Sequence, residues 1–149
     1  MAVTMWDDAL RRSFVERSAK LTTETKAAWG KLSASGVLAH LNDSYRMCLG
    51  DLAVKPRSGP LRYTPIKQLV IYVLPFPKGV PTAPELLARC DGAVLADEKA
   101  AFVQLLDKLA ALGSSDPLPP HPAFGVLTHN AYGTLMARHT DHHFRQFGL

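Results

Sequence analysis

The clearest periodic pattern in the chain lies in its last part. Apolar and histidine positions recur there every three or four residues, as they do on one face of an α-helix. This pattern predicts a helix over Tyr132 to Phe147, with Thr128 as the N-cap residue that opens it. The face predicted to meet the core consists of Tyr132, Leu135, Met136, His139, His143, Gln146 and Phe147.

Three further long helices are predicted upstream by similar spacing. The first extends from about Thr4 to Lys20, and the second contains Val37 to Cys48 and ends at Gly50. The third extends from Ala93 to Leu112, with Gly113 at the position of a C-cap glycine. Each of these helices has one apolar face, so they are expected to pack together.

The segment before the second helix is polar and threonine-rich, and it reads as a connection with Trp29 as its aromatic anchor. Ser33 or Ser35 then serves as the N-cap of the second helix. The segment after that helix, from Ala53 to Pro65, contains the turn-forming residues Pro56, Gly59 and Pro60. We therefore expect a second loop there.

Two segments in the middle of the chain have less regular patterns. The apolar run IKQLVIYVL, residues 66–74, fits a strand or a short helix, and we predict a helix because helical patterns flank it and no partner strand is visible. The following LPFPKGVPTAPELL, residues 74–87, has four prolines and predicts an ordered loop that packs over one end of the domain. The sum is an all-α fold, a four-helix bundle with short extra helices and a proline-rich connecting loop.

Composition is consistent with one domain over residues 1–149. Hydrophobic residues make up 47% and charged residues 20% of the chain, and no apolar run approaches the roughly 18 residues of a membrane span. The opening MAVTMWDDALRRS does not resemble a secretory signal, so a cytoplasmic protein without a membrane partner is expected. The net charge of +4 is spread along the chain, which argues against a nucleic-acid partner. Two cysteines without a CxxC pair predict buried or idle thiols.

Histidines on an apolar face are the unusual feature of this sequence. His139 and His143 are one helical turn apart near the centre of the last helix's apolar face, while His142 falls toward its edge. Buried imidazoles must be hydrogen-bonded, charged at a cost, or bound to something. His40 lies within the buried arc of the second helix, where a lone histidine is more often a core residue than a ligand.

Three motifs carry a resemblance to a known family. WGKLSASGVLAHL, PFPKGVPTAPEL and HPAFGVLTHNAYGTLMARHTDHHFRQFGL resemble the DinB-like superfamily of metalloenzymes, and within it the domain of unknown function 1569. The resemblance extends from about Trp29 to the C-terminus and implies a DinB-like four-helix bundle with a divalent metal. It implies His40, His139 and His143 as the metal ligands. The family often has acidic residues after the threonine that opens the last helix, whereas this chain has His129, Asn130 and Ala131.

The residues themselves agree with such a site. Positions i and i+4 share one helix face, so His139 and His143 can bind one ion, with a third imidazole from a neighbouring helix. Three nitrogen ligands suit Zn²⁺, Ni²⁺ or Fe²⁺. The alternatives are a site that uses His142, and core histidines that are satisfied by carbonyl groups and water.

The resemblance also bears on activity. Some members of the superfamily are thiol-dependent transferases, so a small-molecule substrate and a low-molecular-weight thiol are expected, and metal-assisted hydrolysis is the second reaction considered. A non-enzymatic bundle with a structural ion is the alternative, and a homodimer is compatible with the superfamily. No general base stands out in the sequence, so no catalytic residue is assigned.

The sequence also predicts the roles or positions of four further residues. Gln146 and Asp43 are expected to orient the ligand histidines by hydrogen bonds to the ring nitrogen that does not bind the ion. His121, between prolines, and His129, in the first turn of the last helix, are expected at the surface.

Overall fold

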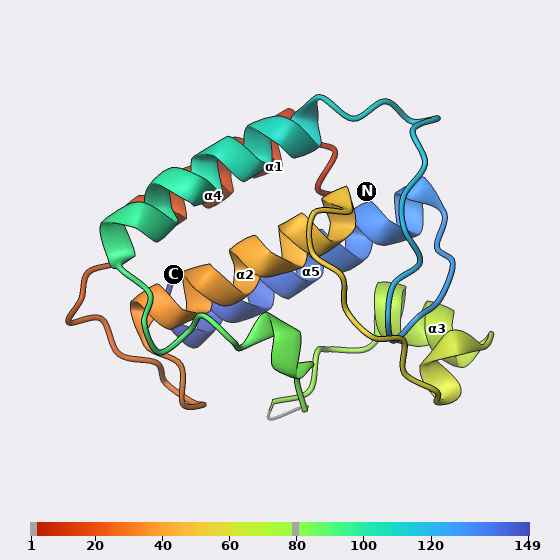
Figure 1. Cartoon of the computed structure of the whole chain (residues 1–149), viewed down its shortest axis with the longest axis horizontal. Coiled ribbons are helices and arrows are strands. Elements are labelled where there is room, and N and C mark those ends of the chain that lie inside the picture. The colour runs from red at the N-terminus through yellow and green to blue at the C-terminus, as the bar shows by residue number, and fades with distance from the viewer. Residues whose placement is uncertain (1–2, 79–80) are drawn as a thin grey trace.

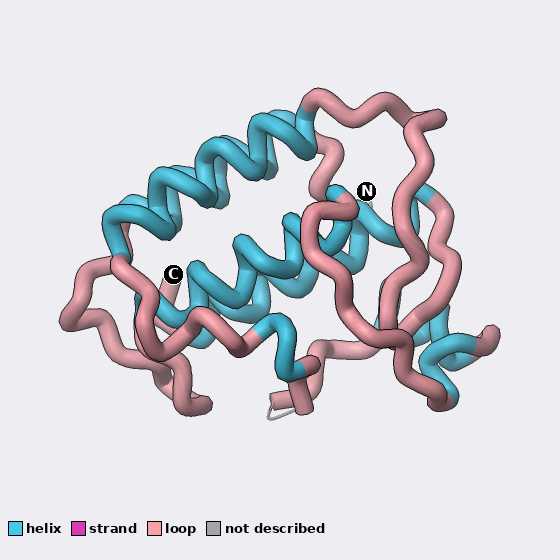
Figure 2. The backbone as a smooth tube through the Cα atoms, in the orientation of Figure 1, coloured by secondary structure: helices cyan, strands magenta, loops and turns pink. Residues whose placement is uncertain are grey.

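Within residues 3–78 and 81–149, which the computed structural model describes, four long helices form a bundle (Figure 1). They are α1 (Asp8–Ala19), α2 (Ala34–Leu49), α4 (Leu95–Ala110) and α5 (His129–Gln146). Helix α4 packs against α1 and α2, and α5 packs against the same two helices. Figure 2 shows the helices joined by loops, with no strand in the described part of the chain. The prediction of an all-α bundle is confirmed.

Short helical turns lie between α2 and α4. The apolar run at residues 66–74 forms α3 (Ile66–Gln68) and then one π-helical turn, η2 (Leu69–Val73), so the helical prediction for it is confirmed. A 3₁₀ turn, η1 (Pro60–Arg62), interrupts the loop before it. The proline-rich segment is a loop with one 3₁₀ turn, η3 (Pro84–Leu86), that packs against α2, and its residues 79–80 lie outside the described residues.

The helix boundaries follow the capping residues. Ser33 caps α2 by accepting a hydrogen bond from the Gly36 amide at 3.0 Å, and Gly50 ends the helix with φ of 83°. Thr128 caps α5 in the same way. Helix α1 begins at Asp8, later than the predicted Thr4, because the side chain of Asp7 accepts from the Leu10 amide and fixes the first turn there.

The predicted C-cap of α4 at Gly113 is wrong. The helix ends at Ala110, and Ala111 closes it in the right-handed conformation, with its amide directed at the Asp107 and Leu109 carbonyl groups. The amide of Gly113 instead donates to the Asp116 carboxylate at 2.6 Å. Gly113 therefore begins a local turn with Asp116 and does not end α4. The helix also starts at Leu95 rather than Ala93.

Aromatic side chains from all four long helices meet in the core. Phe144 of α5 lies 5.8 Å from Phe14 of α1 and 5.7 Å from Phe102 of α4, measured between ring centroids. Tyr45 of α2 also contacts Phe102, and its hydroxyl is 2.6 Å from the hydroxyl of Thr140 on α5. This buried hydrogen bond joins α2 to α5 next to the position where their histidines meet.

The segment before α1 crosses the start of α5. The amide of Met5 donates to the Gly133 carbonyl at 2.9 Å, and the indole of Trp6 donates to the His129 carbonyl at 2.7 Å. The Trp6 ring also stacks on the imidazole of His129, with centroids 4.1 Å apart. The first turn of α5 is thus held by residues more than 120 positions earlier in the chain.

No helix in the described part of the chain combines the length and the apolar character that a bilayer crossing requires.

Candidate metal centre

Three histidines from two helices converge between α2 and α5. The Nε2 atom of His139 lies 3.1 Å from Nε2 of His40 and 3.1 Å from Nε2 of His143. His40 is buried, whereas His139 and His143 are each partly exposed. The three form the cluster of described residues whose ligand atoms are close enough to hold one metal ion. These are the three residues that the family resemblance implied as metal ligands, and their ligand atoms lie close together.

Hydrogen bonds to the far side of two rings decide where their lone pairs lie. Nδ1 of His40 is 3.2 Å from the Leu86 carbonyl, and Nδ1 of His143 is 2.8 Å from the side-chain carbonyl of Gln146. A carbonyl oxygen only accepts, so both Nδ1 atoms carry the proton and both Nε2 atoms present a lone pair. Nε2 of His139 carries at most one proton, so it can donate to Nε2 of His40 or to Nε2 of His143 but not to both. The other pair of nitrogens then meets lone pair to lone pair. A bound cation would remove the remaining repulsion between nitrogens.

The spacing of the nitrogens fits a metal ion. Imidazole nitrogens lie about 2.0–2.1 Å from a Zn²⁺ ion, so neighbouring ligands at angles between 90° and 109° are separated by about 2.8–3.4 Å. Both measured Nε2 separations, at 3.1 Å, fall within this range. A donor set of three imidazoles suits transition metals and not Ca²⁺ or Mg²⁺, which prefer oxygen ligands.

Burial holds all three imidazoles in the neutral form that metal binding needs. Loss of solvation lowers the pKa of His40, lowers that of His143 to about 3, and lowers that of His139 well below its ordinary value. The neighbouring histidines lower the pKa of His139 and of His143 further. At neutral pH the imidazoles therefore need not release a proton from a charged form before their Nε2 lone pairs can bind a metal.

Gln146 is held in place from its other side. Its side-chain amide donates to the Trp29 carbonyl at 2.7 Å, while its oxygen accepts from His143. Gly30 allows this close approach, because a Cβ atom there would lie 2.5 Å from the Gln146 nitrogen, and its φ of +81° also favours glycine. The loop before α2 therefore orients His143 through Gln146, in the role predicted for this residue.

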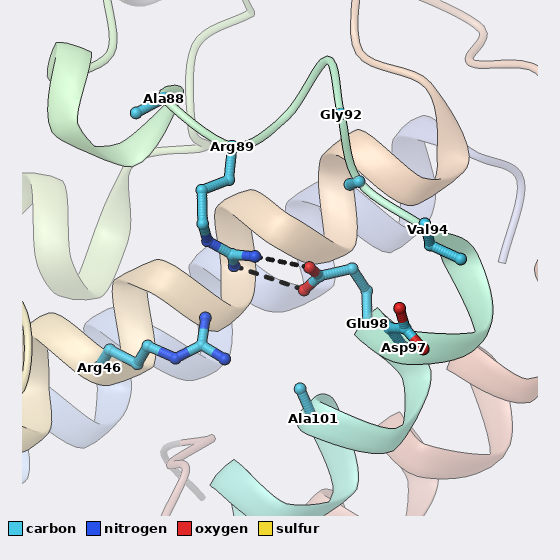
Figure 3. Close-up of a pocket in the computed structure, with 9 residues that line it drawn as sticks. Arg46, Ala88, Arg89, Gly92, Val94, Asp97, Glu98 and Ala101 are labelled. Carbon is cyan, nitrogen blue, oxygen red and sulfur yellow. Dashed lines mark hydrogen bonds and ion pairs between the residues drawn. The ribbon is translucent and has the colours of Figure 1, made fainter.

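The role predicted for Asp43 is wrong. Its carboxylate accepts from Arg46 at 2.7 Å and from Arg89 at 2.9 Å, and it makes no hydrogen bond to His40. Arg89 also pairs with Glu98 of α4 at 2.7 Å (Figure 3). This network holds Arg89 three residues after the end of η3, and the carbonyl of Leu86, the last residue of η3, is the group that orients His40.

Arg46, Arg89 and Glu98 also line a surface cleft of about 540 Å³ (Figure 3). The guanidinium of Arg89 points across this cleft toward Glu98. His40, His139 and His143 do not line the cleft, and the two arginines are neutralised by Asp43 and Glu98. It adds no ligand to the histidine cluster.

The other histidines lie outside the cluster. His142 contacts the rings of Trp29 and Phe76, so its helical phase directs it away from the three converging nitrogens. His121, predicted to be exposed, is half-buried against Phe124, and its Nδ1 accepts from the backbone amides of Ala123 and Phe124. Burial lowers its pKa to about 4.

His129 was also predicted at the surface, and this is wrong as well. The side chain is half-buried, and its stacking on Trp6 covers one face of the ring. The segment that covers it is far away in the sequence, so the position of His129 in the first turn of α5 gave no signal of this contact.

Both cysteines are buried and unpaired, as predicted. Burial raises the pKa of Cys48 to about 12, and burial together with nearby carboxylates raises that of Cys90. Neither thiol is ionised near neutral pH, so neither is suited to act as a nucleophile.

Comparison with models of protein families matches residues 8–148 to the family described as "Protein of unknown function (DUF1569)". The chain belongs to this family. The match covers α1 to α5 and includes all three converging histidines, and it confirms the resemblance to DUF1569. Comparisons of this DUF1569 protein with curated proteins and with solved structures found no match.

Proposed function

We propose that this DUF1569 protein binds one divalent transition metal ion, Zn²⁺, Ni²⁺ or Fe²⁺, through His40, His139 and His143. The observation that carries the proposal is the convergence of three neutral Nε2 atoms at separations that suit one ion. Two of the rings are already oriented with their lone pairs inward by Leu86 and Gln146. A site prepared in this way needs little rearrangement on binding.

We further propose that the site is catalytic, as the resemblance to the DinB-like superfamily implies. Partial exposure of His139 and His143 supports an open site, and three protein ligands leave positions for a substrate. When bound, an ion of this kind lowers the pKa of a coordinated water or thiol and so supplies a nucleophile at neutral pH. The chain's residues hold the ion and exclude solvent on the side of His40, which is buried.

Thiol-dependent transfer is the first reaction we propose. Cys48 and Cys90 are buried with raised pKa values, so the reacting thiol would come from a small molecule. Metal-assisted hydrolysis is the second reaction, with water in place of the thiol. If the ion served only to join α2 to α5, the protein would bind metal without either activity.

Metal analysis of single-residue variants tests the binding proposal. Protein purified without a histidine tag is expected to retain metal, and His40→Ala, His139→Ala and His143→Ala are each expected to lose it. His142→Ala is the matched control, because its ring lies outside the cluster, and it should retain most of the metal. Equal loss in all four variants, or a metal-free wild type after incubation with Zn²⁺, would refute the proposed site.

A separate assay addresses the reaction. The metal-loaded protein is offered a reactive electrophile with and without a small thiol, and consumption of both reactants is measured. Consumption that needs both the thiol and the metal supports transfer. Consumption of the electrophile without a thiol supports hydrolysis, and the absence of either leaves the structural ion as the better explanation.

A further inference from the structure

Two aromatic side chains, Trp29 and Phe76, lie beside the histidine cluster. The imidazole of His142 contacts both rings, with its centroid 5.8 Å from that of Trp29 and 5.8 Å from that of Phe76. Phe76 also lies 6.3 Å from the ring of His139. Trp29 belongs to the loop before α2 and Phe76 to the proline-rich segment, and both are only partly buried. Two loops far apart in the sequence thus present apolar surface beside the proposed metal.

Positive charge accompanies these rings. The ammonium of Lys78, an exposed residue, lies 4.1 Å from the centroid of the Trp29 ring. The guanidinium of Arg138 lies 5.1 Å from the Phe76 ring, and its N–H groups donate to the Val70 and Ile71 carbonyls. Lys78 is therefore the cation at this edge that is placed to meet a ligand from solvent.

Negative charge near the cluster is already neutralised. Asp141, one residue before His142, pairs with Arg17 at 2.9 Å and with Arg145 at 2.8 Å. The converging ligands are neutral imidazoles, so a bound divalent ion would keep its full charge. Both the ion and Lys78 would therefore favour an anion over a cation.

From this arrangement we infer a binding site for a small organic anion with an apolar body, beside His139 and His142. The anionic group, a carboxylate or a thiolate, is directed toward the metal and Lys78, and the apolar body lies against Trp29 and Phe76. The inference rests on the proposed function, because the metal receives the anionic group. The cleft in Figure 3 is less suited to an anion, because Asp43 and Glu98 already neutralise its arginines.

Calorimetric titration of the zinc-loaded full chain tests this inference with three simple probes: benzoate, acetate and benzylamine. Benzoate shares its charge with acetate and its ring with benzylamine, so the comparison separates the two contributions. Benzoate is expected to bind roughly two- to twelvefold more tightly than acetate, since contact with aromatic rings adds about 0.5–1.5 kcal/mol beyond buried area. Benzylamine is expected to bind more weakly than benzoate.

Variants locate the site. Phe76→Leu and Trp29→Leu should each reduce the preference for benzoate over acetate, whereas Tyr63→Leu, at an exposed tyrosine elsewhere, should not. Lys78→Gln should weaken benzoate and acetate alike by about two- to fivefold, as expected for one exposed charge. Lys108→Gln, which removes an exposed lysine from α4, is the matched control and should change neither affinity.

Zinc content, measured before each titration, separates this inference from the proposed function. Failure of the wild type to take up zinc would refute the proposed metal site. Normal zinc uptake with an unchanged benzoate preference in both aromatic variants would overturn the inference alone. Tighter binding of benzylamine than of benzoate would overturn it too.

Discussion

The side chain of Gln146 offers the sharpest test of how the metal site is oriented. The variant Gln146→Met keeps the length of the side chain and removes both of its polar contacts. His143 Nδ1 loses its acceptor at 2.8 Å, and the Trp29 carbonyl loses its donor at 2.7 Å. Without that acceptor, the proton of His143 can move to Nε2, where it competes with the metal.

The expected effect on metal affinity follows from similar partners in other metal sites. Loss of a hydrogen bond that orients a metal-bound histidine reduces affinity by about 10- to 100-fold, which corresponds to about 1.4–2.7 kcal/mol. The metal-free variant should also unfold more readily by about 1 kcal/mol, because the part-buried hydrogen bond to the Trp29 carbonyl is lost. Competition with a chromophoric chelator measures the affinity, and urea denaturation of the metal-free protein measures the stability.

Tyr45→Phe is the matched control. It removes a buried hydrogen bond between α2 and α5, the 2.6 Å contact with Thr140, and leaves the hydrogen bonds of all three ligand histidines unchanged. The control should lose stability while its zinc affinity stays within about twofold of the wild type. If Gln146→Met keeps wild-type affinity, or if Tyr45→Phe loses as much, the orienting role of Gln146 is wrong.

Three further predictions concern stability. Removal of the metal by a chelator should lower the melting temperature. An ion bound only by the folded state adds about 2.7 kcal/mol to the free energy of unfolding at a hundredfold excess over its dissociation constant. An unchanged melting temperature after verified metal removal would contradict a site that joins helices. His121, with a pKa of about 4 in the fold against about 6.5 unfolded, binds fewer protons when folded, so the free energy of unfolding should fall as the pH drops from about 6.5 to 4. In urea titrations of metal-free protein, His121→Asn should reduce this pH-dependent loss of unfolding free energy by about 1–3 kcal/mol. A variant with the same pH profile as the wild type would contradict the role of His121. Gly133→Ala should destabilise the protein by about 1–3 kcal/mol, because its Cβ would overlap the Trp6 indole, and a wild-type urea midpoint would show that Trp6 can move away freely.

The parts of this fold that could be predicted from sequence are those with local causes. Ser33, Gly50 and Thr128 act on amides and carbonyl groups within four residues, so their effect is visible in the sequence alone. The convergence of His139 with His143 likewise follows from helical spacing. Gly113 shows the limit of this reasoning, because the nearby Asp116 captured its amide and the helix ended earlier.

Long-range contacts account for the predictions that were wrong. Asp43 is one turn from His40, but Arg89, 46 residues later in the chain, takes its carboxylate. His129 looked exposed because its cover, Trp6, is 123 residues away. Neither partner leaves a periodic or spacing signal, since each is fixed by how loops cross the bundle. The Leu86 carbonyl that orients His40 could not be predicted for the same reason, as a backbone group has no signature in sequence.

The separation of His40 from His139 along the chain, 99 residues, has a consequence for how the protein acquires its ion. Closing a loop of that length in a disordered chain costs about 4 kcal/mol of entropy from the length-dependent part alone. A newly made or denatured chain therefore offers an ion only histidines that are close in sequence, such as His139 and His143, and His40 joins them when α2 docks on α5. Tight metal retention would thus mark completed assembly of the bundle, and a weakly binding population in a preparation would report chains in which the two helices have not yet docked.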